Sequence, residues 1–476
     1  MSEGWSSASA WDELLDLARR WVLRYQGQVR RLPVLAPVEP GWLASQLPPA
    51  PPMDPEPPEA WFADLERLVL PAVTHWNHPG FLGYFGITGS APGVVGELIA
   101  AALNVNGMLW KTCPALTELE QVVTSWYAQA MGLPGSWFGM IADTASTSTL
   151  LALGAARERA VPGVRDLGLA GGPQLAVYCS QEAHSSVDKA AMVLGLGRQA
   201  VRRIPTDQHF RMRVDGLEAA VQEDRRRGVL PMAVVATVGT TSSTSVDPVP
   251  AIAELCQREG IWLHVDAAYA GSAAVAEEFR WALAGCERAD SFVANPHKWL
   301  FTPLDCSCLY TAHPQAFRAA YALVPAYLST ETPGALDLMD YTFQLGRRFR
   351  ALKLWFVFRA FGIRGLAEQI RRHVGLAQQF ARWVGQSCDF ELLAPVPFSV
   401  VNFRWHPPRL QEESALEKAN RQLLQAVNRR GEVFCSHTVL RGRFALHLAV
   451  GNQRTDEEVL RTAWEEFQTC AAALKL

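Results

Sequence analysis

Hydrophobic positions near the N-terminus follow two helical patterns, separated by a proline-rich stretch. Apolar side chains recur at helical spacing from Trp11 to Tyr25, which predicts an amphipathic helix. A second helix is predicted from Ala115 to Met131, because a proline precedes it, a glycine follows it and its apolar residues share one face. Residues 33–58 contain ten prolines, so we expect an extended arm that is either a linker or packs against another subunit.

The middle of the chain alternates between short apolar runs and helical patterns. Buried strands are predicted at Leu175–Cys179, Ala233–Val238, Ile261–Asp266 and Ser291–Ala294. Helices are predicted between them at Asp215–Arg227 and Pro248–Glu259. This alternation indicates an α/β fold, with a mostly parallel sheet that carries helices on both faces. Ligands of such sheets gather at the carboxyl ends of the strands.

The pattern changes after a helical stretch around residues 347–361. It then runs helix, strand, helix, hairpin and helix, which is typical of a separate α+β unit. Strands are predicted there at Ser399–Trp405, Glu432–Leu440 and Arg443–Ala449. We therefore expect an N-terminal helical and proline-rich arm over residues 1–75, a large domain over 76–360 and a small C-terminal domain over 361–476.

Composition and charge restrict the class of protein further. The 476 residues are 49% hydrophobic and 19% charged, which excludes a disordered or fibrous chain. With 44 Lys and Arg against 47 Asp and Glu, the net charge is −3, so nucleic acid is not an expected partner. Nine irregularly spaced cysteines favour a reducing compartment. Neither a signal-peptide core nor a membrane-length apolar run is evident, so we expect a cytoplasmic protein without a membrane partner.

Two charged clusters follow predicted strands. Lys298 lies directly after one strand, where a desolvated amine can act as a nucleophile toward a carbonyl. Asp266 ends another strand, with His264 on the same face. Taken separately, Lys298 could be an ordinary exposed lysine and Asp266 an aspartate that caps a turn. Together they fit pyridoxal phosphate, which needs an amine to bond its aldehyde and a carboxylate to keep its ring nitrogen protonated.

A hydroxyl-rich segment fits the phosphate of that cofactor. Five of the six residues 144–149 carry hydroxyls, and the segment runs into a helical pattern. A helix start binds phosphate through its backbone N–H groups. A plain helix cap is the alternative. His184, which follows the strand Leu175–Cys179, could lie on the cofactor ring or be an ordinary structural histidine.

Several long motifs, in order, resemble the group II pyridoxal-phosphate-dependent decarboxylases, in particular their aromatic L-amino-acid branch. The resemblance extends from about residue 76 to residue 464. The segments that carry it are Gln181–Ser186, Val235–Thr241, Ile261–Ser272, Asn295–Trp299 and Leu345–Trp355. It implies pyridoxal 5'-phosphate as cofactor, the transferase fold called type I, and a homodimer whose interface holds the active sites and involves the N-terminal arm.

The resemblance also assigns roles to single residues. Lys298 matches the lysine that bonds the cofactor, Asp266 the partner of the ring nitrogen, and His184 the stacking imidazole. Tyr327 matches the tyrosine of a mobile loop that returns a proton after carbon dioxide leaves. The matched cofactor-binding positions are Thr144, Ala145, Ser146, Thr241, Ala268, Asn295 and His297. Asp143-Thr144-Ala145-Ser146 departs from the family's usual glycine-serine-alanine-serine stretch, which puts the detailed phosphate contacts in doubt.

The substrate side of the pocket is expected to be aromatic. The strip His78–Ile87 resembles the family's substrate-pocket segment and has no acidic, lysine or arginine side chain to pair with a glutamate substrate. Ile87 offers no hydroxyl to a phenol, and Met108 stands where many relatives have an aromatic residue, so L-tryptophan is favoured. The predicted pocket residues are Trp76, Phe81, Tyr84, Phe85, Ile87, Met108 and Trp110.

Alternatives to tryptophan decarboxylation stay open on the sequence. Phenylalanine, tyrosine and dihydroxyphenylalanine are other candidate substrates, and the strip aromatics could be mostly core. An aldehyde synthase or aminotransferase on the same cofactor scaffold is a second reading, and a non-catalytic scaffold a third, which Lys298 and Asp266 argue against. His75 and His78 could suggest a metal pair, but no further ligands accompany them and we expect no metal site.

Overall fold

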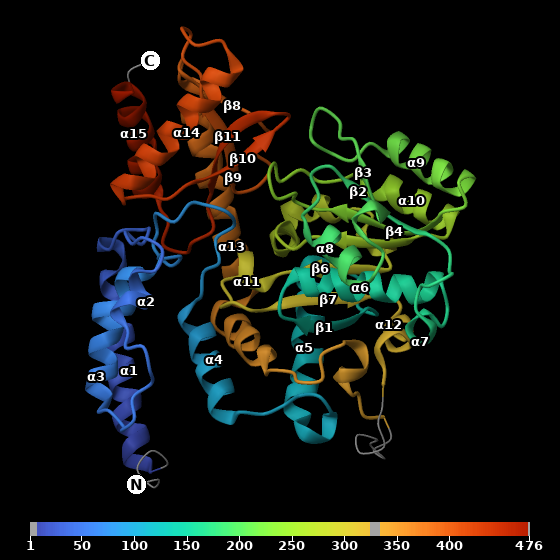
Figure 1. Ribbon diagram of the computed structural model, residues 1–476, viewed down its shortest axis with the longest axis horizontal. Helices are drawn as coiled ribbons and strands as arrows, with labels where there is room; N and C mark the ends of the chain where they lie inside the picture. The colour runs from blue at the N-terminus through green and yellow to red at the C-terminus, as the bar shows by residue number, and fades with distance from the viewer. Residues whose placement is uncertain (1–6, 324–333, 475–476) are drawn as a thin grey trace.

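The computed structural model of the chain describes residues 7–323 and 334–474 (Figure 1). A seven-stranded sheet forms its centre, in the spatial order β1-β7-β6-β5-β4-β2-β3. The strands are β1 Phe138–Ala142, β2 Leu175–Ser180, β3 Val201–Ile204, β4 Leu230–Thr237, β5 Trp262–Asp266, β6 Ser291–Ala294 and β7 Ser307–Thr311. Neighbouring strands from β3 to β6 are parallel, whereas β7 runs antiparallel to both β6 and β1. The predicted mostly parallel sheet is confirmed.

Helices of the large unit pack against this sheet in two groups. They include α5 Pro114–Met131, α6 Ala145–Ala160, α8 Ser186–Val193, α9 Val214–Arg226, α10 Val249–Glu259 and α12 Pro314–Tyr321. Helices α6 and α8 contact each other, as do α9 and α10. Right-handed crossovers place α6 and α8 on one face, because both connections step toward β3. Helices α9 and α10 step back toward β5 and therefore cover the other face (Figure 1).

A second sheet forms the centre of the C-terminal part. Its order is β10-β11-β9-β8, and the strands are β8 Phe390–Leu392, β9 Val400–Trp405, β10 Ser436–Leu440 and β11 Arg443–Ala449. Helices α14 Glu413–Arg430 and α15 Glu457–Ala473 pack beside it, with an apolar core of their own. Helix α13, Arg350–Gln386, connects this part to the large sheet and departs from helical geometry at Gly362. The proposed domain boundary at residue 361 lies beside that glycine and stays a prediction.

The N-terminal segment holds α1 Ala8–Gln28, α2 Trp42–Gln46 and α3 Pro58–Asp64, and Figure 1 shows it at the side of the molecule where α4 Ala91–Leu103 lies. The prediction of an extended arm over 33–58 is wrong at α2. Residues 41–47 form its longest proline-free stretch before the prolines at 48 and 49, so a turn of helix can form there. The arm is anchored to the C-terminal part, where the N–H of Val34 donates to the carbonyl of Gly431 at 3.0 Å.

The other predicted elements agree with the structure except at one strand. Helix α5 has the proline at its start and Gly132 at its end, with φ of 79°. The strand expected at Glu432–Leu440 begins only at Ser436. Before that point, Phe434 pairs instead with the segment 80–82, because its N–H donates to the carbonyl of Gly80 and its carbonyl accepts from Leu82. Strands β1, β3, β7 and β8 were not predicted.

A buried ion pair closes the outer edge of β1. Glu120 Oε1 accepts from the N–H of Ile141 at 2.8 Å, and Arg347 Nη2 donates to the carbonyl of Ile141 at 3.2 Å and to Glu120. Gln121 Nε2 donates to the carbonyl of Gly139 at 3.0 Å. These side chains satisfy backbone groups that an edge strand leaves without a strand partner. Burial raises the pKa of Glu120, and the positive Arg347 opposes that rise.

We expect Arg347→Met to lower the free energy of unfolding by about 3–5 kcal/mol, because Glu120 would remain as an unpaired buried charge. Urea denaturation measures this loss. The double variant Glu120→Gln/Arg347→Met should recover part of it, because the amide keeps an acceptor for Ile141 without the charge. Arg348→Met is the control: the Arg348 side chain, which pairs with Glu97, is 62% exposed, so this ion pair should contribute less than about 1 kcal/mol. Equal losses for the two arginines would contradict the prediction.

Candidate active site

The carboxyl ends of the central strands enclose a cavity of about 230 Å³. Its wall combines residues that follow β1, β2, β4, β5 and β6 with two residues from the segment before α4. The predicted site residues among its lining are Phe85, Ile87, Thr144, Ala145, Ser146, His184, Thr241, Asp266, Ala268, Asn295, His297 and Lys298. The fold therefore brings together ten predicted cofactor or catalytic residues from five loops.

Lys298 lies in the short helix α11, Pro296–Trp299, directly after β6. Desolvation lowers the pKa of its ammonium, and the carboxylate of Asp266 opposes that shift. The Lys298 Nζ atom lies 5.1 Å from the centre of the Phe85 ring. A partly buried amine with a lowered pKa loses its proton more easily than an exposed lysine, as a carbonyl nucleophile must.

Asp266 ends β5 and is 7% exposed. Its Oδ1 accepts from the N–H of Ala268 at 3.1 Å, which turns the small Ala268 toward the cavity. The N–H of Asn295 donates to the carbonyl of Ala268 at 3.1 Å and joins the ends of β5 and β6. A carboxylate and a small floor residue thus lie together beside the lysine.

Helix α6 begins at the cavity with Ala145 and Ser146 in its first turn. The first N–H groups of a helix have no acceptor within it, so this end of the cavity suits an anion. Thr144 at the N-cap makes no side-chain cap bond to the helix; its hydroxyl lies 3.3 Å from Asp143 Oδ1 and its N–H also donates to Asp143. The plain-cap reading of Thr144 therefore has no hydrogen bond to support it.

A chain of buried hydrogen bonds connects α6 to the turn that carries the lysine. Ser148 Oγ lies 3.0 Å from Ser307 Oγ, which donates to Asn295 Oδ1 at 2.7 Å. Asn295 begins the lysine turn, where its carbonyl accepts from the N–H of Lys298 at 3.0 Å. His297 Nδ1 accepts from the N–H of Cys306 at 2.9 Å, so the proton of the neutral ring lies on Nε2, 3.2 Å from Asn295 Nδ2. Burial lowers the pKa of His297 to about 3, so this imidazole is neutral. These bonds connect the α6 side of the cavity to the lysine turn.

His184 follows β2 at the cavity wall, and its Nδ1 accepts from the N–H of Ser186 at 3.1 Å. Desolvation lowers its pKa, Lys298 adds to the shift and Asp266 opposes it. Tyr327, the predicted proton donor, lies outside the described residues.

Five predicted substrate residues do not line this cavity. Trp76 stacks on Phe81, with ring centroids 4.2 Å apart, and on Tyr84 at 5.9 Å; Phe434 of the C-terminal part packs against the last two rings. Phe81 is 1% exposed and therefore core. Met108 and Trp110 lie in a different segment, whose backbone bonds to Met339 and Asp337. The proposed contact of these five side chains with substrate stays a prediction.

Four lining residues were missed by the sequence analysis: Thr237, Gly239, Tyr269 and Leu304. Tyr269 is the central ring of a stack, 4.0 Å from Phe85 and 4.8 Å from Trp299, and its hydroxyl lies 2.7 Å from Ser399 Oγ. It belongs to the motif with Asp266, so its sequence position gave a signal. Thr237 and Gly239 lie at the end of β4 and just after it, and this position could have predicted them. Leu304 has no sequence signal that we can identify.

His75 and His78 have structural partners. Tyr25 Oη lies 3.1 Å from His75 Nδ1, and His78 Nδ1 accepts from the N–H of Gly80 at 2.9 Å. Across residues 7–323 and 334–474, no group of three or more His, Cys, Asp or Glu side chains could hold a metal ion. In the same ranges, no helix is both long enough and apolar enough to cross a bilayer.

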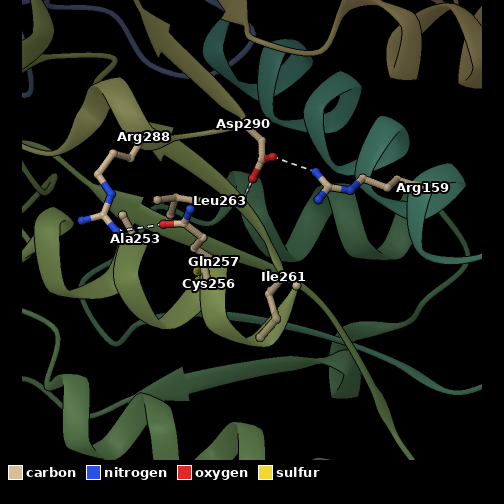
Figure 2. A pocket seen from close by; sticks show the side chains of 9 residues that line it. Arg159, Ala253, Cys256, Gln257, Ile261, Leu263, Arg288 and Asp290 are labelled. Carbon is tan, nitrogen blue, oxygen red and sulfur yellow. Dashed lines mark hydrogen bonds and ion pairs between the residues drawn. The ribbon is translucent and has the colours of Figure 1, made fainter.

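A second cavity, of about 330 Å³, lies at the opposite edge of the sheet, where β5 and β6 begin (Figure 2). Its charged groups are already paired: Asp290 accepts from Arg159 at 2.7 Å and from the N–H of Leu263 at 2.7 Å. Arg288 reaches Gln257 at 3.1 Å. We therefore assign the chemistry to the carboxyl edge.

Comparison with known proteins agrees with this geometry. The family described as "Pyridoxal-dependent decarboxylase conserved domain" matches residues 40–406. The chain belongs to this family. Tyrosine decarboxylase 3 of Petroselinum crispum is 40% identical over 464 residues, which cover 94% of this chain and 89% of that protein. A phenylacetaldehyde synthase of Arabidopsis thaliana is 38% identical over 465 residues, covering 95% of this chain and 94% of that protein.

A solved structure, Oryza sativa TDC with PLP and tryptamine, superposes with a TM-score of 0.96 at 38% identity, covering 98% of this chain and 99% of that one. The fold is therefore the type I fold of pyridoxal-phosphate enzymes. This decarboxylase is a carboxy-lyase of aromatic L-amino acids that uses pyridoxal 5'-phosphate. The cavity fits that cofactor through its amine, its carboxylate, its helix start and a buried hydroxyl, Thr237 Oγ1, that has no partner among the described residues.

A buried histidine, His373, contacts Trp299 at the end of the lysine turn and should make the free energy of unfolding depend on pH. Trp299 Nε1 donates to His373 Nδ1 at 3.0 Å, and burial lowers the pKa of His373 from 6.5 to about 3. Below pH 6.5 the unfolded chain binds a proton that the folded protein does not, so the stability contributed by neutral His373 is lost as the pH falls toward 3.

We expect His373→Gln to reduce the fall in unfolding free energy between about pH 7 and about pH 5.5 by about 1 kcal/mol. Urea denaturation at both pH values measures it. His209→Gln, in an exposed turn, is the matched control, because it removes one histidine without removing a buried one. An unchanged pH dependence in His373→Gln would show that the residue is not a source of this effect.

Proposed function

We propose that this decarboxylase converts L-tryptophan to tryptamine and carbon dioxide in preference to other aromatic amino acids. The observation that carries the proposal is the cavity wall beside Lys298, where Phe85 and Ile87 offer apolar surface without a hydroxyl. Indole can stack on an aromatic face and has one N–H donor to satisfy, whereas the hydroxyls of phenol and catechol both donate and accept and would find no partner on these two side chains. Among the described residues along this cavity, Lys298 is the single lysine or arginine, so a glutamate side chain has no partner either.

We assign each cavity residue a role from its position. Pyridoxal phosphate, when bound, supplies an electron sink for the charge that carbon dioxide leaves on the substrate. Lys298 would hold the cofactor and exchange it with the substrate amine, and Asp266 would keep a proton on the ring nitrogen. Ala268 and His184 would pack on the two ring faces. The start of α6, with Asn295 and His297, would hold the phosphate, while Thr241 would lie near the ring.

We expect Lys298→Ala to abolish turnover, by roughly a thousandfold or more, while circular dichroism shows a folded protein. Asp266→Asn should be nearly as damaging, because an amide cannot stabilise a protonated ring nitrogen. Lys189→Ala, an exposed lysine of α8, is the matched control and should keep wild-type turnover. Decarboxylation at the normal rate by Lys298→Ala would overturn the assignment.

The substrate preference can be measured by competition among equal amounts of tryptophan, tyrosine, phenylalanine, dihydroxyphenylalanine and glutamate. We expect tryptamine as the main amine, with tryptophan ahead of glutamate by orders of magnitude. Ile87→Thr should shift products toward tyramine and dopamine by adding a hydroxyl; Ile87→Val is its control of similar shape. Mainly phenolic amines from the wild type would move the proposal to those substrates, and γ-aminobutyrate would overturn the aromatic pocket.

Aldehyde formation is the alternative reaction, and a relative of this chain is named for it. We assign proton return after loss of carbon dioxide to Tyr327, which favours the amine. Aldehyde is therefore measured beside the amines in the same competition assay. Wild type should release amine, and Tyr327→Phe should release more aldehyde and ammonia when oxygen is present. Aldehyde as the main wild-type product would make the alternative correct.

We further propose a homodimer that completes each cavity from both chains, in the cytoplasm. Helix α4 exposes a row of apolar side chains: Val94, Val95, Leu98, Ile99 and Leu103, each 38–54% exposed. Helix α1 exposes Trp11, Leu15, Val22 and Leu23 in the same way. Such patches are typical of interfaces.

All nine cysteines are free thiols, which suits a reducing compartment. We assign Met108 and Trp110 to the partner's cavity, because neither lines the cavity of its own chain.

Sedimentation velocity tests the dimer. We expect the wild type to sediment at twice the chain mass and Leu98→Glu to shift toward monomer with loss of activity, because a charge would be buried in the interface. Leu167→Glu is the control, since Leu167 is 85% exposed on another helix. A monomeric, fully active wild type would contradict the proposal.

A further inference from the structure

Thr237 carries a buried hydroxyl without a partner at the edge of the cofactor cavity. The residue ends β4, lines the cavity and is 4% exposed. Its Oγ1 is buried and makes no hydrogen bond to any residue in 7–323 or 334–474. An unsatisfied buried hydroxyl lowers stability, so its presence at a ligand cavity calls for an explanation.

The backbone of Thr237 is fixed from both sides. Its N–H donates to Asp247 Oδ2 at 2.8 Å, and its carbonyl accepts from the N–H of Asp247 at 2.9 Å. The N–H of the next residue, Val238, donates to the carbonyl of Asp266 on the neighbouring strand β5 at 2.9 Å. With its backbone fixed in this way, the side chain of Thr237 can adjust only by rotation about χ1.

Register places the hydroxyl beside the carboxylate of Asp266. Thr237 and Asp266 are partners across the parallel pair β4 and β5, so their side chains point to the same face of the sheet. Asp266 Oδ1 accepts from the N–H of Ala268, and no side chain within residues 7–323 and 334–474 donates to this carboxylate. A carboxylate has capacity for further donors, and Thr237 has a donor to give.

We infer that Thr237 is a positioning residue for Asp266, and the inference rests on the proposed role of Asp266 at the cofactor's ring nitrogen. Its hydroxyl rotates to donate to the Asp266 carboxylate when the ring is bound, which holds the carboxylate in line with the ring nitrogen. A hydrogen bond to an ionised group is stronger than one between neutral groups, so the bond offsets the cost of the buried hydroxyl in the loaded enzyme.

Cofactor binding tests the inference without any need for turnover. Apoenzyme is titrated with pyridoxal 5'-phosphate and with 1-deazapyridoxal 5'-phosphate, in which a C–H replaces the ring nitrogen, and the dissociation constants come from absorbance. Wild type should bind the natural cofactor more tightly. Thr237→Val should weaken binding of the natural cofactor by about tenfold, the size of one hydrogen bond to a charged group, and leave binding of the deaza analogue unchanged.

Two further variants control for packing. Thr237→Ser keeps the hydroxyl and should keep the wild-type preference between the two cofactors. Thr117→Val removes another buried hydroxyl without a partner, on α5 and outside the cavity, and should change neither constant. Thr237→Ala serves as a second hydroxyl-free variant if the valine side chain prevents folding, which circular dichroism of the apoenzyme shows.

The outcomes separate this inference from the proposed function. If wild type binds both cofactors equally, the role of Asp266 fails and the inference fails with it. If wild type discriminates but the hydroxyl-free variants keep that discrimination, or weaken both cofactors by the same factor, the role of Asp266 stands and Thr237 does not position it. Loss of discrimination in the hydroxyl-free variants alone supports the inference.

Discussion

The removal of the Lys298 ammonium from water beside Asp266 is the interaction on which the rest of the cavity depends. Desolvation favours the neutral amine, and the neighbouring carboxylate opposes it. The net result is a lowered pKa, so this amine releases its proton more easily than an exposed lysine does. A parallel sheet provides this environment because the buried ends of adjacent strands converge at one edge. The alternation of strands and helices in the sequence therefore produces the sheet edge at which Lys298 and Asp266 meet.

Rigidity around the lysine comes from contacts that cross between elements. The chain of hydrogen bonds from Ser148 through Ser307 to Asn295 connects helix α6 to the lysine turn. The rings of Phe85, Tyr269 and Trp299 also stack on one another, and Phe85 and Tyr269 line the cavity. Buried polar networks are stable only when their members are satisfied, so each hydroxyl in this one is under a strong geometric constraint.

The sequence predicted the parts of this structure that local pattern determines. Strands β4, β5 and β6 are short and mostly apolar, as is typical of strands buried on both faces, although β5 also carries His264 and Asp266. Strand β3 was missed because two arginines interrupt its short run, and β1 because Gly139 lies within it. The cofactor residues were found because each follows a strand or begins a helix within a long motif. The family resemblance supplied their roles, which spacing alone left open.

Long-range packing accounts for what the sequence could not provide. Nothing in the segment from Trp76 to Tyr84 reveals that Phe434, over three hundred positions later, pairs with its backbone and packs on its rings. The same is true of Thr237. Its position at a strand end is visible in the sequence, but its lack of a partner depends on every side chain packed around it.

The capped edge of β1 also limits how two copies of this protein can meet. Strand addition across two molecules requires free N–H and carbonyl groups along an edge. At β1, Glu120, Gln121 and Arg347 occupy such groups of Gly139 and Ile141 with side chains. The large sheet cannot continue there into a second molecule, nor serve as a template for fibril growth on that side. Association at this end must therefore use side-chain surfaces, and the sheet remains a property of one chain.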